Sequence, residues 1–425
     1  MYRLFAFYYL VLCIQKILIM SKLIVNIAKL CLGQDTKRPL LADKLSELNF
    51  IENAWLLIVH GRIADWGTME NCPERADEII DAAGGFVLPA FVDSHTHLVF
   101  AAAREQEFVQ RIQGLSYQEI AQKGGGILNS ARKLADCSED KLLEDAFARL
   151  QEVISYGTGA IEVKSGYGLS VEAELKMLRV IRKLKEISTI PIKSTFLGAH
   201  AMPLAFKENR SGYINQILDE MLPRIAGEGL ADYIDVFCEK GFYSVEETDL
   251  ILDAGAKYGL RPKIHCNQFN SMGGIETAIK YNAISVDHLE VLNDTEIEAL
   301  SNSNTIATLL PSAPFFLNDD HFPPARKLVD SKVAIALASD FNPGTSPSGN
   351  MQFVLSLACI KLRLTPEEAF NAATINAAFA LEMEGELGSI SKGKKANLMI
   401  TVPMPSLAFM PYYFGSNLVK RMIIS

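Results

Sequence analysis

The chain has 425 residues, which is enough for one large barrel or for two domains. With 49% hydrophobic and 21% charged residues, its composition is that of an ordinary globular protein. The formal net charge of -9 argues against nucleic acid or an anionic membrane surface as a partner. The seven cysteines are odd in number, scattered and free of any CxxC motif, so we expect a reduced, cytoplasmic chain.

The first 20 residues form an apolar stretch with one arginine near its start. A signal peptide or membrane anchor has this character, but Gln15 and Lys16 interrupt the stretch and no small-residue cleavage site follows. We therefore interpret residues 1–20 as the result of a misplaced start codon or as a non-functional extension, and we expect the first strand to begin near residue 21. No other segment of the sequence has the length and hydrophobicity to span a bilayer, so no membrane partner is expected.

The two flanks of the remaining chain, residues 21–85 and 385–425, are rich in short runs with strand character. Examples are KLIVNIA near the beginning and ANLMITV near the end. We expect the two flanks to combine into one small β-sandwich domain.

Between the flanks, residues 86–384 alternate short apolar runs with amphipathic stretches. The first run, residues 86–92, follows two glycines and is too short for a free-standing helix, which indicates a buried strand. Counting it and a weakly marked second unit near residues 124–135, we expect the eight strand-plus-helix units of a TIM-like (β/α)8 barrel, an α/β fold. Further strands are expected at the apolar runs 160–168, 192–200, 233–239, 263–268, 283–290, 305–313 and 333–344.

Five of the seven histidines and one aspartate share a position at or just past the C-terminal end of an expected barrel strand. These residues are His95, His97, His200, His265, His288 and Asp340. Residues i and i+2 of a strand point to the same face, so His95 and His97 project together. The C-terminal ends of barrel strands converge on one face, which is where barrel enzymes place their sites. His60 and His321 lie elsewhere, and we interpret them as structural or surface residues.

Several imidazoles beside a carboxylate indicate a mononuclear metal site for Zn²⁺ or Fe²⁺, completed by a water. The expected ligands are His95, His97, His265 and Asp340. Such a metal lowers the pKa of its water from about 15.7 to about 7, which gives hydroxide at neutral pH. His288 is a candidate to take or relay the proton, and Asp340 can bond the water as well as the metal.

The motif VDSHTH on the first strand, the two later strand-end histidines and the dipeptide SD on the last strand resemble the amidohydrolase superfamily of metal-dependent hydrolases. Within it, the chain is similar, from about residue 21 to its end, to the branch that hydrolyses 4-imidazolone-5-propanoate to N-formimidoyl-L-glutamate in histidine degradation. The motifs that carry this similarity are FVDSHTHLVFAAAREQEF, EVKSGYGL, TFLGAHA, VDHLE, SDFNPGTSP and PSLAFMPYYFGSN. The resemblance implies one divalent metal per chain, zinc or iron, a small-molecule substrate and a homodimer.

The resemblance also implies the substrate contacts. The propionate of the substrate suits a guanidinium, which binds carboxylates in a bidentate way, and Arg104 matches the arginine of the family. Arg104 could instead pair with Glu105 or Glu107 on a surface helix. Tyr167 matches a substrate-binding tyrosine, and His200 would bond the ring carbonyl or nitrogen.

The loop after the last strand and one glutamine complete the expected set of substrate contacts. Asn342, Gly344 and Thr345 follow Asp340 and could hold the polar end of the substrate. Aromatic deaminases of this superfamily place a glutamate where this chain has Gln268. A glutamine cannot carry a proton but can hydrogen-bond a ring amide, so we interpret Gln268 as a substrate contact, and its presence argues against a deaminase.

Two other functions stay open at this point. Another cyclic amidohydrolase, hydantoinase-like or dihydroorotase-like, would use a carboxylated lysine, here Lys164, to bridge two metals. A barrel that has lost its metal and serves assembly or signalling would usually have lost ligands as well, and none of the four expected here is missing. The number of metals bound per chain separates these functions.

Overall fold

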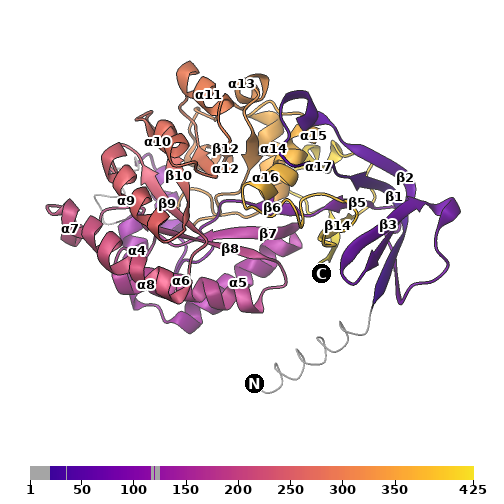
Figure 1. Cartoon of the computed structure of the whole chain (residues 1–425), viewed down its shortest axis with the longest axis horizontal. Coiled ribbons are helices and arrows are strands. Elements are labelled where there is room, and N and C mark those ends of the chain that lie inside the picture. Colours follow the sequence, from indigo (N-terminus) through magenta and orange to yellow (C-terminus); the bar gives the residue numbers. More distant parts are fainter. Residues whose placement is uncertain (1–19, 35, 116–118, 120–124) are drawn as a thin grey trace.

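The computed structural model describes residues 20–425 apart from residues 35, 116–118 and 120–124. The expected N-terminal extension therefore lies, except for Met20, outside the described residues. Two sheets lie side by side, a parallel barrel and a sheet made from both ends of the chain (Figure 1). No helix in the described part of the chain has the length and hydrophobicity to cross a membrane.

The barrel is an eight-stranded sheet whose neighbouring strands are parallel. In order around the sheet, its strands are β6 (Phe91–Asp93), β7 (Thr158–Lys164), β8 (Ile192–Ala199), β9 (Tyr233–Cys238), β10 (Arg261–Cys266), β11 (Ser285–His288), β12 (Ile306–Leu309) and β13 (Ile335–Leu337). The seam between the first and last strands is closed by Asp93, which accepts hydrogen bonds from Ser339 N at 2.9 Å and Ser339 Oγ at 2.5 Å. The sequence-based fold class is thus confirmed.

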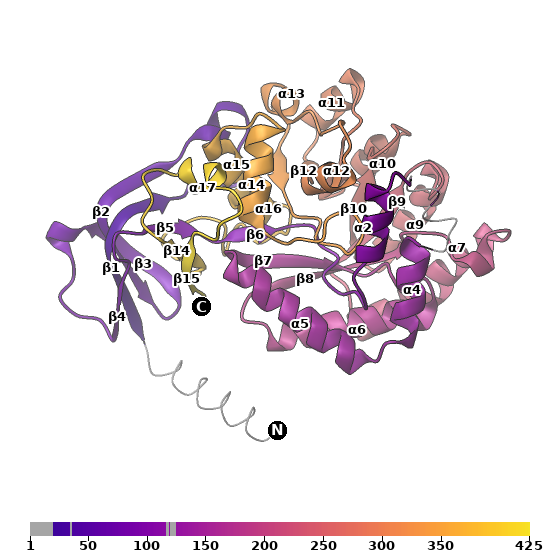
Figure 2. The ribbon, with the colours of Figure 1, turned by 180° about the vertical axis from the view of Figure 1, so that it is seen from behind.

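Helices alternate with the strands and cover the outside of the barrel (Figures 1 and 2). They include α5 (Glu139–Ser155), α6 (Val171–Ile187), α7 (Arg210–Asn215), α8 (Leu222–Glu228), α9 (Val245–Lys257), α10 (Gly274–Lys280), α11 (Asp294–Ser301), α12 (Ser312–Leu317), α13 (Ala325–Asp330), α14 (Met351–Ile360), α15 (Pro366–Ala372) and α16 (Ile375–Phe379). Local sequence sets several helix starts. Ser244 and Glu247 form a capping box at α9, which satisfies backbone N–H groups that the first helical turn leaves without partners.

The weakly marked second unit near residues 124–135 is not a barrel strand. Together with this unit, the sequence predicts nine strands, one more than the eight that the barrel contains. Residues Ile127–Asp136 form a helix, α4, which begins after Gly126 in a left-handed conformation with φ 77°. Its buried Leu134 lies seven residues after Ile127, a spacing that belongs to a helix face and not to strand alternation. The true second strand is β7, at the run expected over 160–168.

The expected first strand, residues 86–92, is split between the two sheets. β5 (Phe86–Pro89) pairs with β1 (Ser21–Leu32) and β14 (Leu398–Thr401), while β6 (Phe91–Asp93) enters the barrel. Ala90 lies between them, and its N–H donates to Asn397 O at 3.0 Å. One apolar run therefore links the two sheets rigidly, just before the first two site histidines.

The terminal sheet has seven strands and draws on both flanks of the chain, as expected from their strand character. Besides β1, β5 and β14 it contains β2 (Asn49–Val59), β3 (Arg62–Thr68), β4 (Glu78–Asp81) and β15 (Val419–Ile423). Ile24, Leu56 and Leu398 belong to its separate apolar core. Figure 2 shows α2 (Glu105–Ile112) and α4 on the side of the barrel away from this sheet.

Candidate metal centre

Four side chains from three strand ends converge on one point inside the barrel mouth. His95 Nε2 and His97 Nε2 lie 3.6 and 3.7 Å from Asp340 Oδ1, and His265 Nε2 lies 3.4 Å from His97 Nε2. Ligands bound tetrahedrally at the usual zinc distance of about 2.0–2.1 Å lie about 3.4 Å from one another. The spacing therefore fits a single metal ion.

The surroundings of this cluster also fit a metal. All four side chains are buried, and His95 Nε2 has no hydrogen-bond partner among the described residues. Burial, followed by Lys164 for His95 and by His200 for His97, holds the pKa of both histidines well below the usual range. Both rings are therefore neutral and can offer a nitrogen lone pair to a cation.

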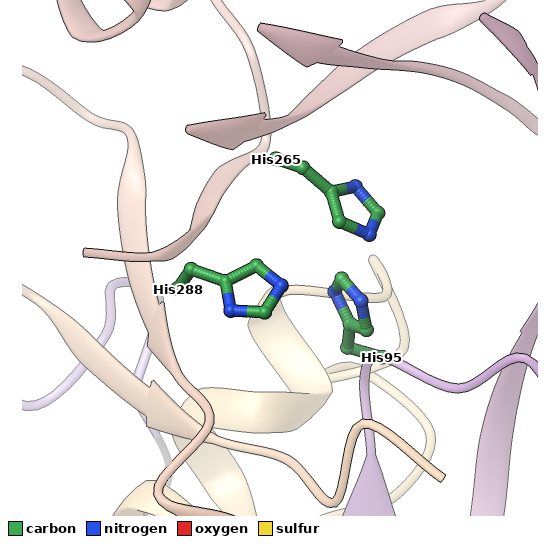
Figure 3. A group of neighbouring side chains, drawn as sticks. All are labelled: His95, His265 and His288. Carbon is green, nitrogen blue, oxygen red and sulfur yellow. The ribbon is translucent and has the colours of Figure 1, made fainter. Parts of the chain in front are cut away.

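His288 lies beside the same cluster, and Figure 3 shows its ring facing those of His95 and His265. One nitrogen of each of these three rings lies within 4.8 Å of the others. His288 has a backbone φ of 89° and Asp340 has one of 54°. Non-glycine residues seldom adopt this left-handed region, and such strain is concentrated at functional sites.

Two carboxylates that the sequence analysis missed stand behind the histidines. Asp287 Oδ2 lies 2.6 Å from His95 Nδ1, and Asp235 Oδ2 lies 2.8 Å from His265 Nδ1. The first contact is a hydrogen bond, and a histidine that donates Nδ1–H to a carboxylate keeps Nε2 free and correctly turned for a metal. The second is a close contact that is not aligned as a hydrogen bond. Asp235 and Asp287 occupy inward-facing positions of buried strands, where a charged residue is rare without a partner. A carboxylate in such a strand could therefore have been identified from the sequence as part of the site.

Lys164 connects these carboxylates. Its Nζ lies 2.8 Å from Asp235 Oδ2, 2.8 Å from Glu162 Oε1 and 3.7 Å from Asp287 Oδ2. Burial alone would lower the pKa of this lysine, but Asp235 and then Glu162 raise it overall, so the amine is a charged ammonium. Carboxylation requires a neutral amine, and this geometry therefore does not favour Lys164 as a bridging ligand between two metals.

Arg104 lies just before α2, at the opening of the barrel. It is 8% exposed, and its Nε donates to Ser130 Oγ at 3.1 Å. Its Nη1 lies 3.8 Å from Glu107 Oε2, beyond hydrogen-bond distance, and its Nη2 has no hydrogen-bond partner among the described residues. Arg104 is therefore held in place with part of its guanidinium left for a carboxylate ligand.

Tyr167 and His200 line the same space from neighbouring loops. The ring of His97 lies 5.7 Å from that of Tyr167 and stacks on that of His200 at 5.2 Å. Burial and then His265 lower the pKa of His200 to about 3, so its ring is neutral. His200 Nδ1 lies 3.0 Å from the Gly166 carbonyl, which can only accept, so Nδ1 carries the proton and Nε2 is an acceptor.

The loop after Asp340 is held together by the side chain of Asn342. The Asn342 amide donates to Asp340 O at 2.7 Å and to Thr345 Oγ1 at 2.8 Å, and its oxygen accepts from the backbone N–H groups of Gly344 and Thr345. Thr345 Oγ1 also lies 3.3 Å from Asp340 Oδ2. Gly344 packs directly under the guanidinium of Arg104, where a side chain would collide. This loop thus positions both a metal-ligand candidate and the arginine.

A cavity of about 1320 Å³ opens above the cluster, and it is lined by nearly all the residues that the sequence predicted. His95, at the base of the cluster, and Gly344, under Arg104, are the two predicted residues that do not line it. The residues that do are His97, Arg104, Tyr167, His200, His265, Gln268, His288, Asp340, Asn342 and Thr345.

Comparison with known proteins agrees with this geometry. Residues 86–417 match the amidohydrolase family. The imidazolonepropionase of Flavobacterium johnsoniae is 57% identical over 382 residues, which cover 90% of this chain and 93% of that protein. The imidazolonepropionase of Thermoanaerobacter pseudethanolicus is 41% identical, with 91% and 92% covered. The structure of guanine deaminase from E. coli superposes over 95% and 97% of the two chains with a TM-score of 0.72 at 17% identity, which is a likeness of fold.

The chain belongs to the amidohydrolase family, because the family match runs through the whole barrel and includes all the residues of the candidate metal centre. The two bacterial relatives narrow this assignment, since their identity extends over nine-tenths of the chain. Within the family, the chain is one of the imidazolonepropionases.

Proposed function

We propose that this chain hydrolyses 4-imidazolone-5-propanoate to N-formimidoyl-L-glutamate in histidine degradation. The observation that carries the proposal is one cavity in which a buried metal-ligand cluster faces a guanidinium with an unpaired nitrogen among the described residues. The first group suits hydrolysis of a cyclic amide, and the second suits the propionate of the substrate. The names of the relatives support the same substrate.

The residues proposed to hold the metal are His95, His97, His265 and Asp340. When bound there, a divalent zinc or iron ion would lower the pKa of a water and polarise the ring carbonyl. Asp287 and Asp235, which lie behind His95 and His265, would help to keep the Nε2 atoms of these two rings available to the ion.

His288 is proposed to move the proton. Hydrolysis adds water oxygen to the carbonyl carbon, breaks the carbon–nitrogen bond of the ring and leaves the nitrogen in need of a proton. His288 lies beside the cluster, and its Nδ1 is 3.4 Å from Glu290 Oε1, so its other nitrogen faces the reacting groups. It can therefore take the proton of the attacking water and return it to the leaving nitrogen, while Asp340 bonds the water.

Binding of the substrate is proposed to use the outer wall of the cavity. Arg104 binds the propionate, and Tyr167 and Gln268 contact the ring. His200, whose Nε2 is an acceptor, suits a ring N–H better than the carbonyl. Thr345, which lines the cavity, would contact the substrate. The side chain of Asn342 and both backbone groups of Gly344 are already hydrogen-bonded, so these two residues would act by holding the loop and Arg104 in place.

The test is to mix purified protein with freshly made imidazolone propionate and to follow the loss of its ultraviolet absorbance with and without a chelator. Fast loss that the chelator abolishes is the expected result. If the absorbance does not fall although one metal is bound per chain, the assignment of a hydrolase site would stand, but the proposed substrate would be refuted. Two metals per chain would instead favour a hydantoinase-like or dihydroorotase-like enzyme.

We also propose that the enzyme is a homodimer of the cytoplasm. Tyr412 and Phe414, at and just after α17 (Phe409–Tyr412), are 76% and 65% exposed, an unusual exposure for aromatic side chains that an interface would explain. The six described cysteines are free, as expected in a reducing compartment. Light scattering after size-exclusion chromatography gives the mass, and a monomer would refute the dimer.

A further inference from the structure

Glu174 is a fully buried carboxylate near the start of α6 that the proposed reaction does not use. Its Oε1 accepts hydrogen bonds from Gly168 N at 2.6 Å and Leu169 N at 3.0 Å, and its Oε2 accepts one from Gly166 N at 3.0 Å. All three donors are backbone groups of the loop that joins β7 to α6. The carboxylate therefore acts as an anion around which this loop is wrapped.

The loop needs such an anchor because of its backbone conformation. Gly166 and Leu169 have φ values of 111° and 51°, and the second is a conformation that leucine rarely adopts. Gly168 packs so closely on the backbone of α6 that no side chain fits there. Without the carboxylate, three buried N–H groups would lose their partner, and the loop would change shape to satisfy them.

This loop carries or holds two of the proposed substrate contacts. Tyr167 lies at its centre, and its ring is 5.4 Å from that of His200. The Gly166 carbonyl accepts the hydrogen bond from His200 Nδ1, so the same short segment also fixes the orientation of His200. One carboxylate thus controls the position of two side chains in the cavity without lining the cavity itself.

Glu174 is not needed to hold the neighbouring elements. Ser170 caps α6 by accepting from Ala173 N, and the Glu174 N–H, not its carboxylate, bonds Ser170 O. On the other side, the Ser165 hydroxyl also bonds the Glu174 carboxylate, but Ser165 is tied to β8 independently of it. Its N–H donates to Thr195 O, and its Oγ accepts from Leu197 N. Loss of the carboxylate should therefore loosen residues 166–169 and leave the helix and the strand in place.

We infer that Glu174 is a positioning residue for substrate binding, which acts through the loop on Tyr167 and His200. The inference rests on the proposed function, because those two side chains are proposed substrate contacts. The inference predicts that a change at Glu174 weakens substrate binding and leaves the metal content unchanged.

The experiment compares Glu174→Gln with the wild type, each measured also in a Tyr167→Ala background. The amide keeps the size of the carboxylate but turns an NH₂ group toward the N–H groups of the loop. We expect Glu174→Gln to raise KM about tenfold, with kcat changed less than about threefold and metal content unchanged. In the Tyr167→Ala background the same change should raise KM by less than about threefold, since the Tyr167 contact is already lost and only that of His200 can still be disturbed.

The matched control is Glu368→Gln. Glu368 is also a buried carboxylate, but it caps α15 and pairs with Arg326, and it does not line the cavity. This change should lower the melting temperature and leave KM unaltered. If Glu174→Gln does not fold, Glu174→Asp keeps the charge but is one methylene too short to reach all three donors, and the same increase in KM is expected.

An unchanged KM in a folded Glu174 variant, or an equal increase in both backgrounds, would overturn the inference alone. A wild type that does not open the substrate ring would overturn the proposed function, and this inference with it. Turnover by the wild type therefore separates the two failures.

Discussion

The floor and the rim of the cavity are built in different ways. The floor, defined as His95, His97, His265 and Asp340, is supported by buried charges. A carboxylate lies behind His95 and another behind His265, and an ammonium lies between these carboxylates. The rim, defined as Arg104, Tyr167, Gln268 and Asn342, lies on loops that uncharged donors and single side chains hold in place. Hydrogen bonds tie these loops to α4 through Ser130 and to α6 through Glu174, and Asn342 closes its own loop.

The difference follows from what each part must hold. A cation site needs neutral rings with fixed lone pairs and a strong local field, and buried charges supply both when each one is paired. A ligand site needs shape and a few polar groups, which loops supply and can change without disturbing the barrel. We therefore expect changes in the floor to abolish the chemistry and changes in the rim to alter binding.

The largest expected effect comes from breaking the floor itself. His265→Ala removes one proposed ligand, and activity should fall by at least about a thousandfold because the metal-activated water is lost. Elemental analysis should find much less metal per chain than in the wild type. His321→Ala, at an exposed histidine, is the control and should change neither quantity. Full metal content in the His265 variant would show that the ligand set is wrong.

The next effect tests the support of the floor. Lys164→Met leaves Asp235 and Asp287 without their ammonium, while Glu162 keeps that of Lys263. Metal affinity should therefore fall about 10- to 100-fold and the free energy of unfolding by about 3–5 kcal/mol. A chelator competition and a denaturant titration measure the two. Lys183→Met, which breaks the surface pair with Glu139, should cost no more than about 1 kcal/mol and leave the metal bound. Wild-type metal affinity in the Lys164 variant would contradict this account.

A smaller effect is expected at the rim. Arg104→Lys keeps the charge but loses the fork that binds a carboxylate in a bidentate way, so KM should rise about tenfold, the equivalent of one charge-assisted hydrogen bond. The metal content and the melting temperature should stay the same. Arg224→Lys, at an exposed ion pair with Glu172, serves as the control. If the metal content fell in the Arg104 variant, this arginine would support the metal site and not only the binding of substrate.

The floor was largely predictable from the sequence, and its support was not. The pair His95 and His97 after a buried strand, with further histidines at later strand ends, follows directly from strand periodicity and barrel geometry. The same periodicity says which way Asp235 and Asp287 point but not which side chains they meet, since their partners come from other strands. The pairing of Lys164 with both aspartates therefore emerges only in three dimensions.

Errors in the fold prediction have a similar cause. The run 86–92 is uniformly apolar, so hydrophobicity gives no sign that it crosses from one sheet to another at Ala90. At residues 124–135, the sequence pattern is too short to distinguish a strand from a helix. A strand is predicted there from the sequence, but residues 127–136 form a helix. Likewise, nothing in the sequence shows that the amide of Asn342 is used up within its own loop.

The smallest effect concerns the proton and lies between floor and rim. Burial alone would lower the pKa of His288, but the carboxylate of Glu290, followed by Asp340 and Asp287, raises it above the usual value. Glu290→Gln removes the nearest of these charges, so the pKa of His288 should fall.

The sign of the pH change then identifies the role of His288. If the neutral ring takes a proton, activity rises with pH through the pKa of His288, and the acid limb of the kcat/KM profile should move to lower pH in Glu290→Gln. If the charged ring is required instead, the basic limb moves to lower pH and activity is lost at high pH. We expect the first result, with unchanged metal content and no shift in Glu368→Gln. If the pH profile of kcat/KM does not shift in Glu290→Gln, Glu290 has no part in setting the proton transfer.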